Sequence, residues 1–183
     1  MRTKISLKTI LFIIPVSLIC ILIVYVNIFD NTFKLAIPVK GASQSNWSSV
    51  SYWYCPTDTS KVHKGIDIFS PQKTPVLSPV AGLVISQGVS NNGGRFIYLF
   101  GGGCRIYYFA HLNTIEVSRF SFLWKKDEMG TVGNSGNALS KPYHLHFSIF
   151  SLIPIFKNYD HPAAQGWKKM FYLNPNDYLV KAK

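Results

Sequence analysis

Residues 95–110 read RFIYLFGGGCRIYYFA, and this stretch indicates the fold more clearly than any other part of the chain. Two runs rich in Ile, Tyr and Phe flank a glycine-rich turn. This pattern is typical of a β-hairpin, because β-branched and aromatic residues favour strands and glycine tolerates positive φ. The stretch therefore predicts two antiparallel strands, at 95–100 and 104–110.

Similar apolar runs lie on both sides of this hairpin and are separated by clusters of Gly, Pro, Asn and Ser. They predict further strands at 65–69, 74–77, 80–87 and 144–150. GVSNNGG at 88–94 predicts a second hairpin turn. No long amphipathic helix is expected after the first 30 residues, and residues 174–180 predict one short closing helix. The expected fold class is a mainly β, antiparallel domain.

An uncharged apolar run, ILFIIPVSLICILIVYVNIF, covers residues 10–29. Twenty helical residues span about 30 Å, the thickness of the hydrocarbon core of a bilayer. Arg2, Lys4 and Lys8 precede the run, so the positive-inside rule places the N-terminus in the cytoplasm and the rest of the chain outside. We therefore predict a single-pass anchor in the cytoplasmic (inner) membrane. A cleaved signal peptide is the alternative, although the run is long and no A-x-A-like site follows it closely.

The length of 183 residues fits one folded domain behind this segment. We expect a cytoplasmic N-terminus at 1–9, the membrane helix at 10–29, a polar, turn-rich stalk at 30–51 and the domain at 52–183. From residue 33 onward, 16 Lys and Arg against 7 Asp and Glu give a formal charge of +9. This charge fits anionic wall polymers or lipids as neighbours, and it equally fits a charge that only keeps the domain soluble. No nucleic-acid partner is expected, because no nucleic-acid-binding motif accompanies the charge.

Histidines and one aspartate occur in three separated segments: HKGID at 63–67, AHL at 110–112 and HLHF at 144–147. His144 and His146 are two residues apart on a predicted strand, so both project from one face of it. Two imidazoles and one carboxylate form the ligand set of several catalytic zinc sites, which leave a fourth position open. Four histidines and one aspartate are enough for three ligands and two proton carriers. Taken alone each segment is weak evidence, because ordinary surface polar residues give the same pattern, although the pair His144 and His146 is more informative than His63 with Asp67.

These segments, in this order, resemble peptidase family M23, the lysostaphin- and LytM-like peptidases. HKGIDIFSPQKTPVLSPVAGLVIS at 63–86 is similar to the family's HxGxD motif and the strands after it. RIYYFAHL at 105–112 resembles a further family strand, and GTVGNSGNALSKPYHLHFSI at 130–149 resembles the glycine-rich stretch that ends in HLHF. The resemblance covers about residues 52–150.

The resemblance implies a β-sheet groove in which His63, Asp67 and His146 bind Zn²⁺ and His111 and His144 form a catalytic pair. It also implies hydrolysis of amide bonds in peptidoglycan peptides by an exported endopeptidase. The two catalytic histidines would orient the attacking water and carry its proton to the leaving amine, with their separate roles left open. A regulatory or wall-binding module without catalysis and a zinc-dependent peptidoglycan amidase are the alternatives.

Some positions depart from the family pattern. Ser148 replaces the glutamate that commonly follows HLHF, Tyr143 stands where a small residue or proline is usual, and residues 117–133 differ as a stretch. We expect these changes to bear on substrate choice more than on metal binding. Gly65 has an expected structural role, in a turn that needs positive φ.

The remaining candidates carry weaker expectations. His161 has no matching family position and is expected in a surface loop. Tyr107 and Tyr108 alternate on a strand, so one should be buried and the other can face the groove. Cys55 and Cys104 are the two cysteines of the exported part, and they can either pair or remain as free thiols.

Overall fold

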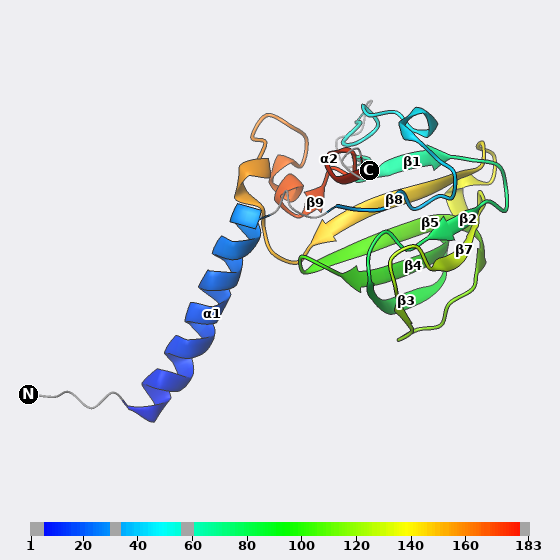
Figure 1. Cartoon of the computed structure of the whole chain (residues 1–183). Coiled ribbons are helices and arrows are strands. Elements are labelled where there is room, and N and C mark those ends of the chain that lie inside the picture. The colour runs from blue at the N-terminus through cyan, green and yellow to red at the C-terminus, as the bar shows by residue number, and fades with distance from the viewer. Residues whose placement is uncertain (1–5, 30–33, 56–60, 180–183) are drawn as a thin grey trace, which may run out of the picture.

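The computed structural model describes residues 6–29, 34–55 and 61–179, and Figure 1 shows their arrangement. Within these residues nine strands form one antiparallel sheet in the order β1-β8-β5-β4-β3-β6, with β9 beside β8 and with β7 between β5 and β2. The strands are β1 (Ile66–Phe69), β2 (Pro75–Leu77), β3 (Gly82–Ser90), β4 (Gly94–Gly101), β5 (Arg105–Ile115), β6 (Phe122–Leu123), β7 (Glu128–Val132), β8 (His144–Ser151) and β9 (Tyr172–Leu173).

Helices lie at the two ends of the described chain and in its loops. Those of the α type are α1 (Leu7–Phe29) and α2 (Asn176–Leu179). Short 3-10 helices are η2 (Gln44–Asn46), η3 (Gly136–Ala138), η4 (Phe156–Asn158) and η5 (Gly166–Met170).

The core forms because apolar side chains alternate along the long central strands and point to one face of the sheet. The fully buried members are Ile66 and Ile68 of β1, Ile97 and Leu99 of β4, Tyr107 and Phe109 of β5, and Leu145, Phe147 and Ile149 of β8. Alternate positions of β8, including both of its histidines, point to the opposite face. This alternation is what presents polar side chains as a group on one surface of the sheet.

The mainly antiparallel β fold is confirmed, and each strand expected from the sequence has a counterpart in β1, β2, β3, β4, β5 and β8. The glycine-rich hairpin turn is present, with Gly103 and Cys104 both at positive φ. The second turn is tighter than expected, because β3 continues to Ser90 and β4 starts at Gly94.

Three strands were not expected: β6, β7 and β9. Strands β6 and β9 have two residues each, too few to give a periodic pattern. Strand β7, EMGTV, contains Gly130 at a φ of +158° and has no alternation that would indicate a strand. The closing helix is shorter than expected, since α2 covers 176–179, and residue 180 lies outside the described residues.

Residues 34–47, which we expected in a stalk, pack against the sheet. Leu35 and Val39 are almost completely buried, and Val39 pairs with Val76 of β2. Trp47 is also buried and donates a hydrogen bond from Nε1 to Asn176 Oδ1 at 2.8 Å. The packed domain therefore begins near Leu35 and not at residue 52. Single apolar side chains in a polar segment can be buried one at a time, so the polar composition of this segment did not indicate its packing.

Helix α1 extends away from the sheet (Figure 1). Its apolar side chains are mostly exposed. It is long and apolar enough to cross a membrane, a property that signal sequences share. Its last turn contacts the domain: Val26 is buried, Asn27 Nδ2 donates to the Pro154 carbonyl at 3.0 Å, and the Phe156 N–H donates to Asn27 Oδ1 at 2.9 Å. The helix end is thus fixed to one loop of the domain.

Candidate metal centre

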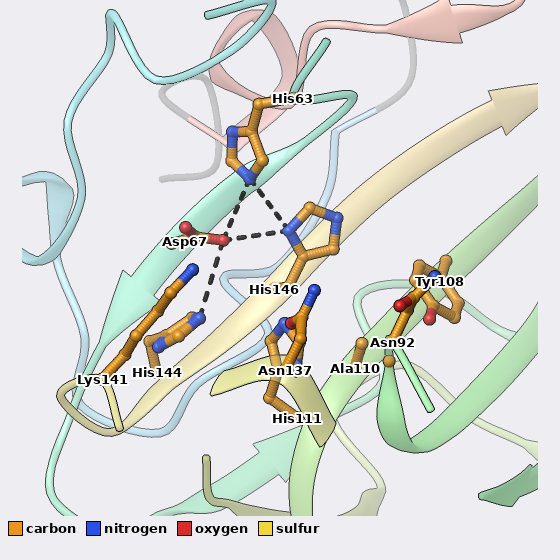
Figure 2. Close-up of a pocket in the computed structure, with 11 residues that line it drawn as sticks. His63, Asp67, Asn92, Tyr108, Ala110, His111, Asn137, Lys141, His144 and His146 are labelled. Carbon is orange, nitrogen blue, oxygen red and sulfur yellow. Dashed lines mark hydrogen bonds and ion pairs between the residues drawn. The ribbon is translucent and has the colours of Figure 1, made fainter. Parts of the chain in front are cut away.

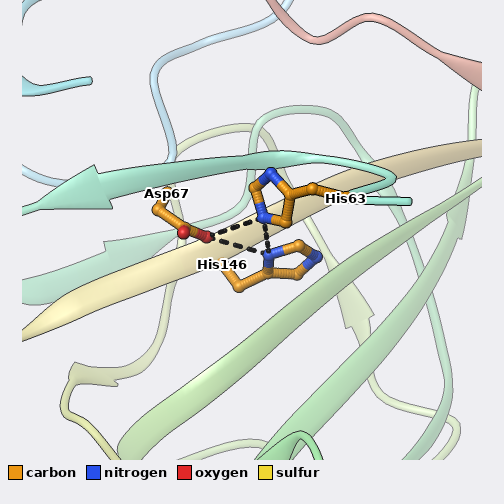
Figure 3. Close-up of side chains that lie close together, drawn as sticks. All are labelled: His63, Asp67 and His146. Atoms are coloured by element: carbon orange, nitrogen blue, oxygen red, sulfur yellow. Dashed lines mark hydrogen bonds and ion pairs between the residues drawn. The ribbon is translucent and has the colours of Figure 1, made fainter. Parts of the chain in front are cut away.

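Three side chains converge on one point of the polar face of the sheet (Figure 3). His63 Nε2 lies 3.2 Å from Asp67 Oδ1 and 3.1 Å from His146 Nδ1, and His146 Nδ1 lies 2.9 Å from Asp67 Oδ1. Among the described residues, these form a group of His, Cys, Asp or Glu side chains that could hold a metal ion.

The positions of Asp67 and His146 follow directly from strand pairing. Strand β1 runs antiparallel to β8, and the register places Asp67 opposite His146. Directly opposed residues project from the same face of a sheet and lie close together. His63 comes from the segment just before β1, whose backbone is held by two bonds, Trp53 N to His63 O at 2.8 Å and His63 N to Tyr54 O at 3.1 Å.

Gly65 allows this segment to approach β8. An added Cβ at this position would lie 2.5 Å from the Phe147 carbonyl oxygen and 3.0 Å from His146 Cε1. The φ of Gly65 is outside the positive range that favours glycine. A structural role is therefore confirmed, but its cause is close packing against the backbone of β8, and the expectation of a positive-φ turn was wrong.

The geometry of the cluster fits a tetrahedral zinc ion. Ligand atoms about 2.0–2.1 Å from zinc at tetrahedral angles are about 3.3 Å apart. The three separations here, between 2.9 and 3.2 Å, are close to that value. His63 Nδ1 lies 2.8 Å from the Ser51 carbonyl oxygen, so Nδ1 carries the proton and Nε2 has its lone pair available. The residues present therefore fit the group that the sequence implied.

The electrostatics of the cluster keep Asp67 ionised. Burial raises the pKa of Asp67, but hydrogen bonds and charge from His146 and His63 outweigh it and hold the pKa well below its usual range. Burial lowers the pKa of His63, but its hydrogen bond to Asp67, the Asp67 charge and its hydrogen bond to Ser51 together outweigh burial, so the pKa is raised. For His146 burial dominates and lowers the pKa. An ionised carboxylate between two imidazoles is an arrangement that favours a bound cation.

His144 lies beside the cluster and deeper in the sheet. Its side chain is 3 % exposed, and its Nε2 is 4.0 Å from Asp67 Oδ1. Its Nδ1 lies 2.8 Å from the Pro142 carbonyl oxygen, which can only accept, so Nδ1 donates and Nε2 is left as an acceptor. His144 is therefore close to the three converging side chains, but its ring nitrogens are not among the atoms that converge.

His111 reaches the same place through an irregularity in β5. The pairing register between β4 and β5 shifts next to it, and His111 has a φ of +63°, rare for a residue with a side chain. Its ring lies 5.0 Å from that of His144 and 6.0 Å from that of His146, measured between centroids. The bulge lets consecutive residues Ala110 and His111 both line the cavity described next.

These side chains surround an open cavity of about 240 Å³ (Figure 2). The lining combines the cluster and both further histidines with Tyr108, Asn92, Gly93, Asn137 and Lys141. Sequence reasoning did not select the two asparagines or Lys141. Asn92 lies in the NNGG turn at 91–94, and Asn137 and Lys141 lie in the GNALSK stretch at 136–141. Their place in these two turn-rich stretches is the only indication of a role that the sequence contains.

Two glycines bring these loops together. Gly94 and Gly136 both have positive φ, and a Cβ added to Gly136 would lie 2.2 Å from the Gly94 nitrogen. His111 is fixed at this junction, because its Nδ1 donates to the Ser135 carbonyl at 2.9 Å and its N–H donates to the Gly93 carbonyl at 2.8 Å. Burial lowers the pKa of His111 to about 4, so the ring is neutral at neutral pH.

The remaining sequence expectations have clear outcomes. Tyr107 is completely buried and Tyr108 lines the cavity, as their alternation predicted. His161 is exposed and stands apart from the cavity lining, with its ring 6.3 Å from that of Tyr159. Cys104 has a free thiol, so it does not pair with Cys55 in this structure.

The structure thus combines an antiparallel sheet with a His-Asp-His cluster in an open cavity. The sequence profile of peptidase family M23 matches residues 61–156, which is more than half of the chain. The chain therefore belongs to peptidase family M23. A relative described as an uncharacterized metalloprotease, from Buchnera aphidicola subsp. Baizongia pistaciae, is 29% identical over 94 residues, or 51% of this chain. The match spans 24% of that relative's length.

Solved structures have the same fold. A Pseudomonas aeruginosa protein assigned to peptidase M23 superimposes with a TM-score of 0.55 and 24% identity, over 80% of this chain and 50% of that one. A zinc containing peptidase from Vibrio cholerae superimposes with a TM-score of 0.53 and 22% identity, over 63% of this chain and 36% of that one. This chain thus spans half or less of the length of both proteins.

Proposed function

We propose that this chain is a zinc metalloendopeptidase that hydrolyses amide bonds in peptidoglycan peptides at the outer face of the cytoplasmic membrane. The observation that carries the proposal is the separation of His63 Nε2, Asp67 Oδ1 and His146 Nδ1 by 2.9–3.2 Å within an open cavity. Membership of a peptidase family and similarity to a zinc containing peptidase support it.

In this proposal His63, Asp67 and His146 hold the metal. Zinc at this position would supply Lewis acidity, which polarises a carbonyl group and lowers the pKa of a water ligand to about 7. The two imidazoles are neutral and the single carboxylate balances only one of the two charges of Zn²⁺, so the site would retain a net positive charge when occupied. That charge favours the oxyanion that develops when a peptide bond is attacked.

His111 and His144 act as the proton carriers. Each has its Nδ1–H bonded to a backbone carbonyl, of Ser135 and Pro142 respectively, so each has Nε2 as a proton acceptor. Both rings lie within the same cavity as the cluster. One of these rings can take the proton from the attacking water at Nε2, and that same ring, once protonated, can donate a hydrogen bond to the oxyanion or deliver the proton to the leaving amine.

The membrane location rests on α1. Its length and apolar composition suit a membrane span, and three basic residues precede its uncharged part. The contacts of Asn27 with Pro154 and Phe156 then place the domain directly at the end of the helix. A hydrolase in this position acts on wall peptides close to the membrane surface.

Digestion of purified peptidoglycan by the full-length protein in detergent, with mass spectrometry of the products, tests the function. The proposal expects new amino and carboxyl termini within the peptides, dependent on added zinc. Release of intact stem peptides from the glycan would instead identify an amidase. Unchanged peptidoglycan at full zinc occupancy would contradict catalysis and favour a wall-binding module.

A further inference from the structure

The cavity with the proposed metal ligands continues along the sheet into two others. Tyr108 and His146 line both the first cavity and a second one of about 390 Å³. The second cavity shares Lys64, Phe150 and Tyr172 with a third one of about 330 Å³. We call the second and third cavities together the lysine trough. A peptide extended from the metal cluster in this direction would lie on it.

The trough has an aromatic floor and two ammonium groups. Tyr98, Tyr108, Phe150 and Tyr172 contribute rings, with Tyr98 and Tyr108 stacked at 4.6 Å. The Lys64 ammonium lies 5.6 Å from the centre of the Tyr172 ring, and Lys168 enters from η5 beside Trp167. Such a floor holds the backbone and apolar parts of a peptide, while the ammonium groups can select its charge.

No carboxylate is found among the described residues that line the trough. Ser148, which also lines the trough, is uncharged. Lys64 lines both cavities of the trough and Lys168 lines one of them, so the two ammonium groups lie beside the same space. Two like charges held beside an aromatic floor would be stabilised by an anionic group of the ligand.

We propose that Lys64 and Lys168 bind a carboxylate of the substrate peptide, so that the protein prefers peptidoglycan peptides with free carboxylates over amidated ones. This inference rests on the proposed function, because it assigns a substrate class to the same site. Lys64 directly follows His63, so a carboxylate held there lies only a few residues from the bond at the metal cluster. The ammonium groups thereby also set the register of the peptide in the groove.

The test uses the full-length protein in detergent and one purified cross-linked peptidoglycan peptide in two forms. One form has its carboxylates free, and in the other they are converted to amides. Binding of both forms is measured on chelator-treated, metal-free protein, and kcat/KM is measured on the zinc-loaded protein. We expect a preference of about fivefold to tenfold for the free carboxylates in both measurements, the size of a partly desolvated ion pair.

Lys64→Gln should reduce this preference to about twofold or less, and Lys64→Arg should largely restore it because the charge is kept. Lys73→Gln is the matched control, since it removes one positive charge from an exposed position outside the trough. It should keep the wild-type preference. An equal preference in the wild type and Lys64→Gln, an equal loss in Lys73→Gln, or no binding of either peptide would overturn the inference.

The two measurements separate this inference from the proposed function. If metal-free protein prefers the free carboxylates but zinc-loaded protein hydrolyses neither form, the trough is a binding site and the proposed catalysis is wrong. If both forms are hydrolysed and bound equally well, the catalysis stands and the assignment of Lys64 and Lys168 is wrong.

Discussion

The Nδ1–H group of His63 donates a hydrogen bond to the carbonyl oxygen of Ser51 at 2.8 Å. Because a carbonyl oxygen can only accept, this contact fixes the tautomer of His63 and turns its Nε2 toward Asp67 and His146. Ser51 lies in the segment that sequence patterns assign to a stalk. A residue outside every recognisable motif therefore orients one of the three proposed metal ligands.

We expect the full-length protein to bind close to one zinc ion per chain. His63→Ala or His146→Ala should each weaken zinc binding by more than the roughly 10–100-fold loss typical of changes around a metal's ligands, because each removes a ligand itself. Elemental analysis after gel filtration measures the zinc content. His161→Ala is the matched control and should retain the metal, since His161 is remote from the cluster. Full zinc retention by both ligand variants would refute the assignment.

Catalysis and metal binding should be separable. His144→Ala and His111→Asn should retain zinc but lose about 10²- to 10⁴-fold in peptidoglycan hydrolysis, or about 3 to 5 kcal/mol of transition-state stabilisation. Asparagine is chosen at position 111 because it tolerates the positive φ found there better than alanine does. Hydrolysis rates are compared at equal zinc content. Near-native rates in both variants would rule out the proposed proton carriers even with the metal site intact.

Gly65 should be intolerant of even one added methyl group. Gly65→Ala would place a Cβ against the backbone of β8, so we expect a loss of about 1–3 kcal/mol in unfolding free energy and weaker zinc binding. Gly88→Ala is the control, because its added Cβ would meet only the Phe96 ring at 3.5 Å, an ordinary contact. Urea denaturation measures both variants. Equal unfolding free energies for the two variants would show that β1 and β8 accommodate the added methyl group without loss of stability.

The buried His111 should make stability depend on pH in the metal-free protein. Its pKa is about 4 in the folded state, below the ordinary value of 6.5, so the unfolded chain binds the proton more readily. The stability contributed by neutral His111 is therefore present above pH 6.5 and is lost as pH falls toward 4. The loss should reach about 2–3 kcal/mol.

Comparison with His111→Asn isolates this contribution from those of the neighbouring ionisable groups. Urea denaturation in the presence of a chelator gives the unfolding free energy of both proteins. Between pH 6.5 and pH 4 the wild type should lose about 2–3 kcal/mol more unfolding free energy than the variant. A difference that stays constant over this range would show that His111 titrates normally.

The topology expected from α1 can be tested on cells. The protein should sediment with membranes and resist extraction by high salt, because residues 10–29 of its 23-residue helix are uncharged and mostly apolar. The domain should be digested by protease added outside the cytoplasmic membrane. Recovery of a soluble form that begins near Ser43 would show that the N-terminal segment is removed as a signal peptide.

The sequence by itself determined the class of fold and the residues of the candidate site. Runs of β-branched and aromatic residues in 95–100, 104–110 and 144–150 indicated strands, whose side chains alternate between two faces, and both this preference and this period are local. The same alternation placed His144 and His146 on one face and separated Tyr107 from Tyr108. The ordered histidine and aspartate segments supplied the residues of the cluster.

Tertiary structure alone decided how those residues meet. The register between β1 and β8 sets Asp67 opposite His146, and register depends on pairing between segments 79 residues apart. The bulge that turns His111 into the cavity, the loop contact of Gly94 with Gly136, and the burial of residues 34–47 likewise depend on distant partners. Such contacts leave no periodic trace along the chain, because the free energy that fixes them comes from packing between segments and not from local preference.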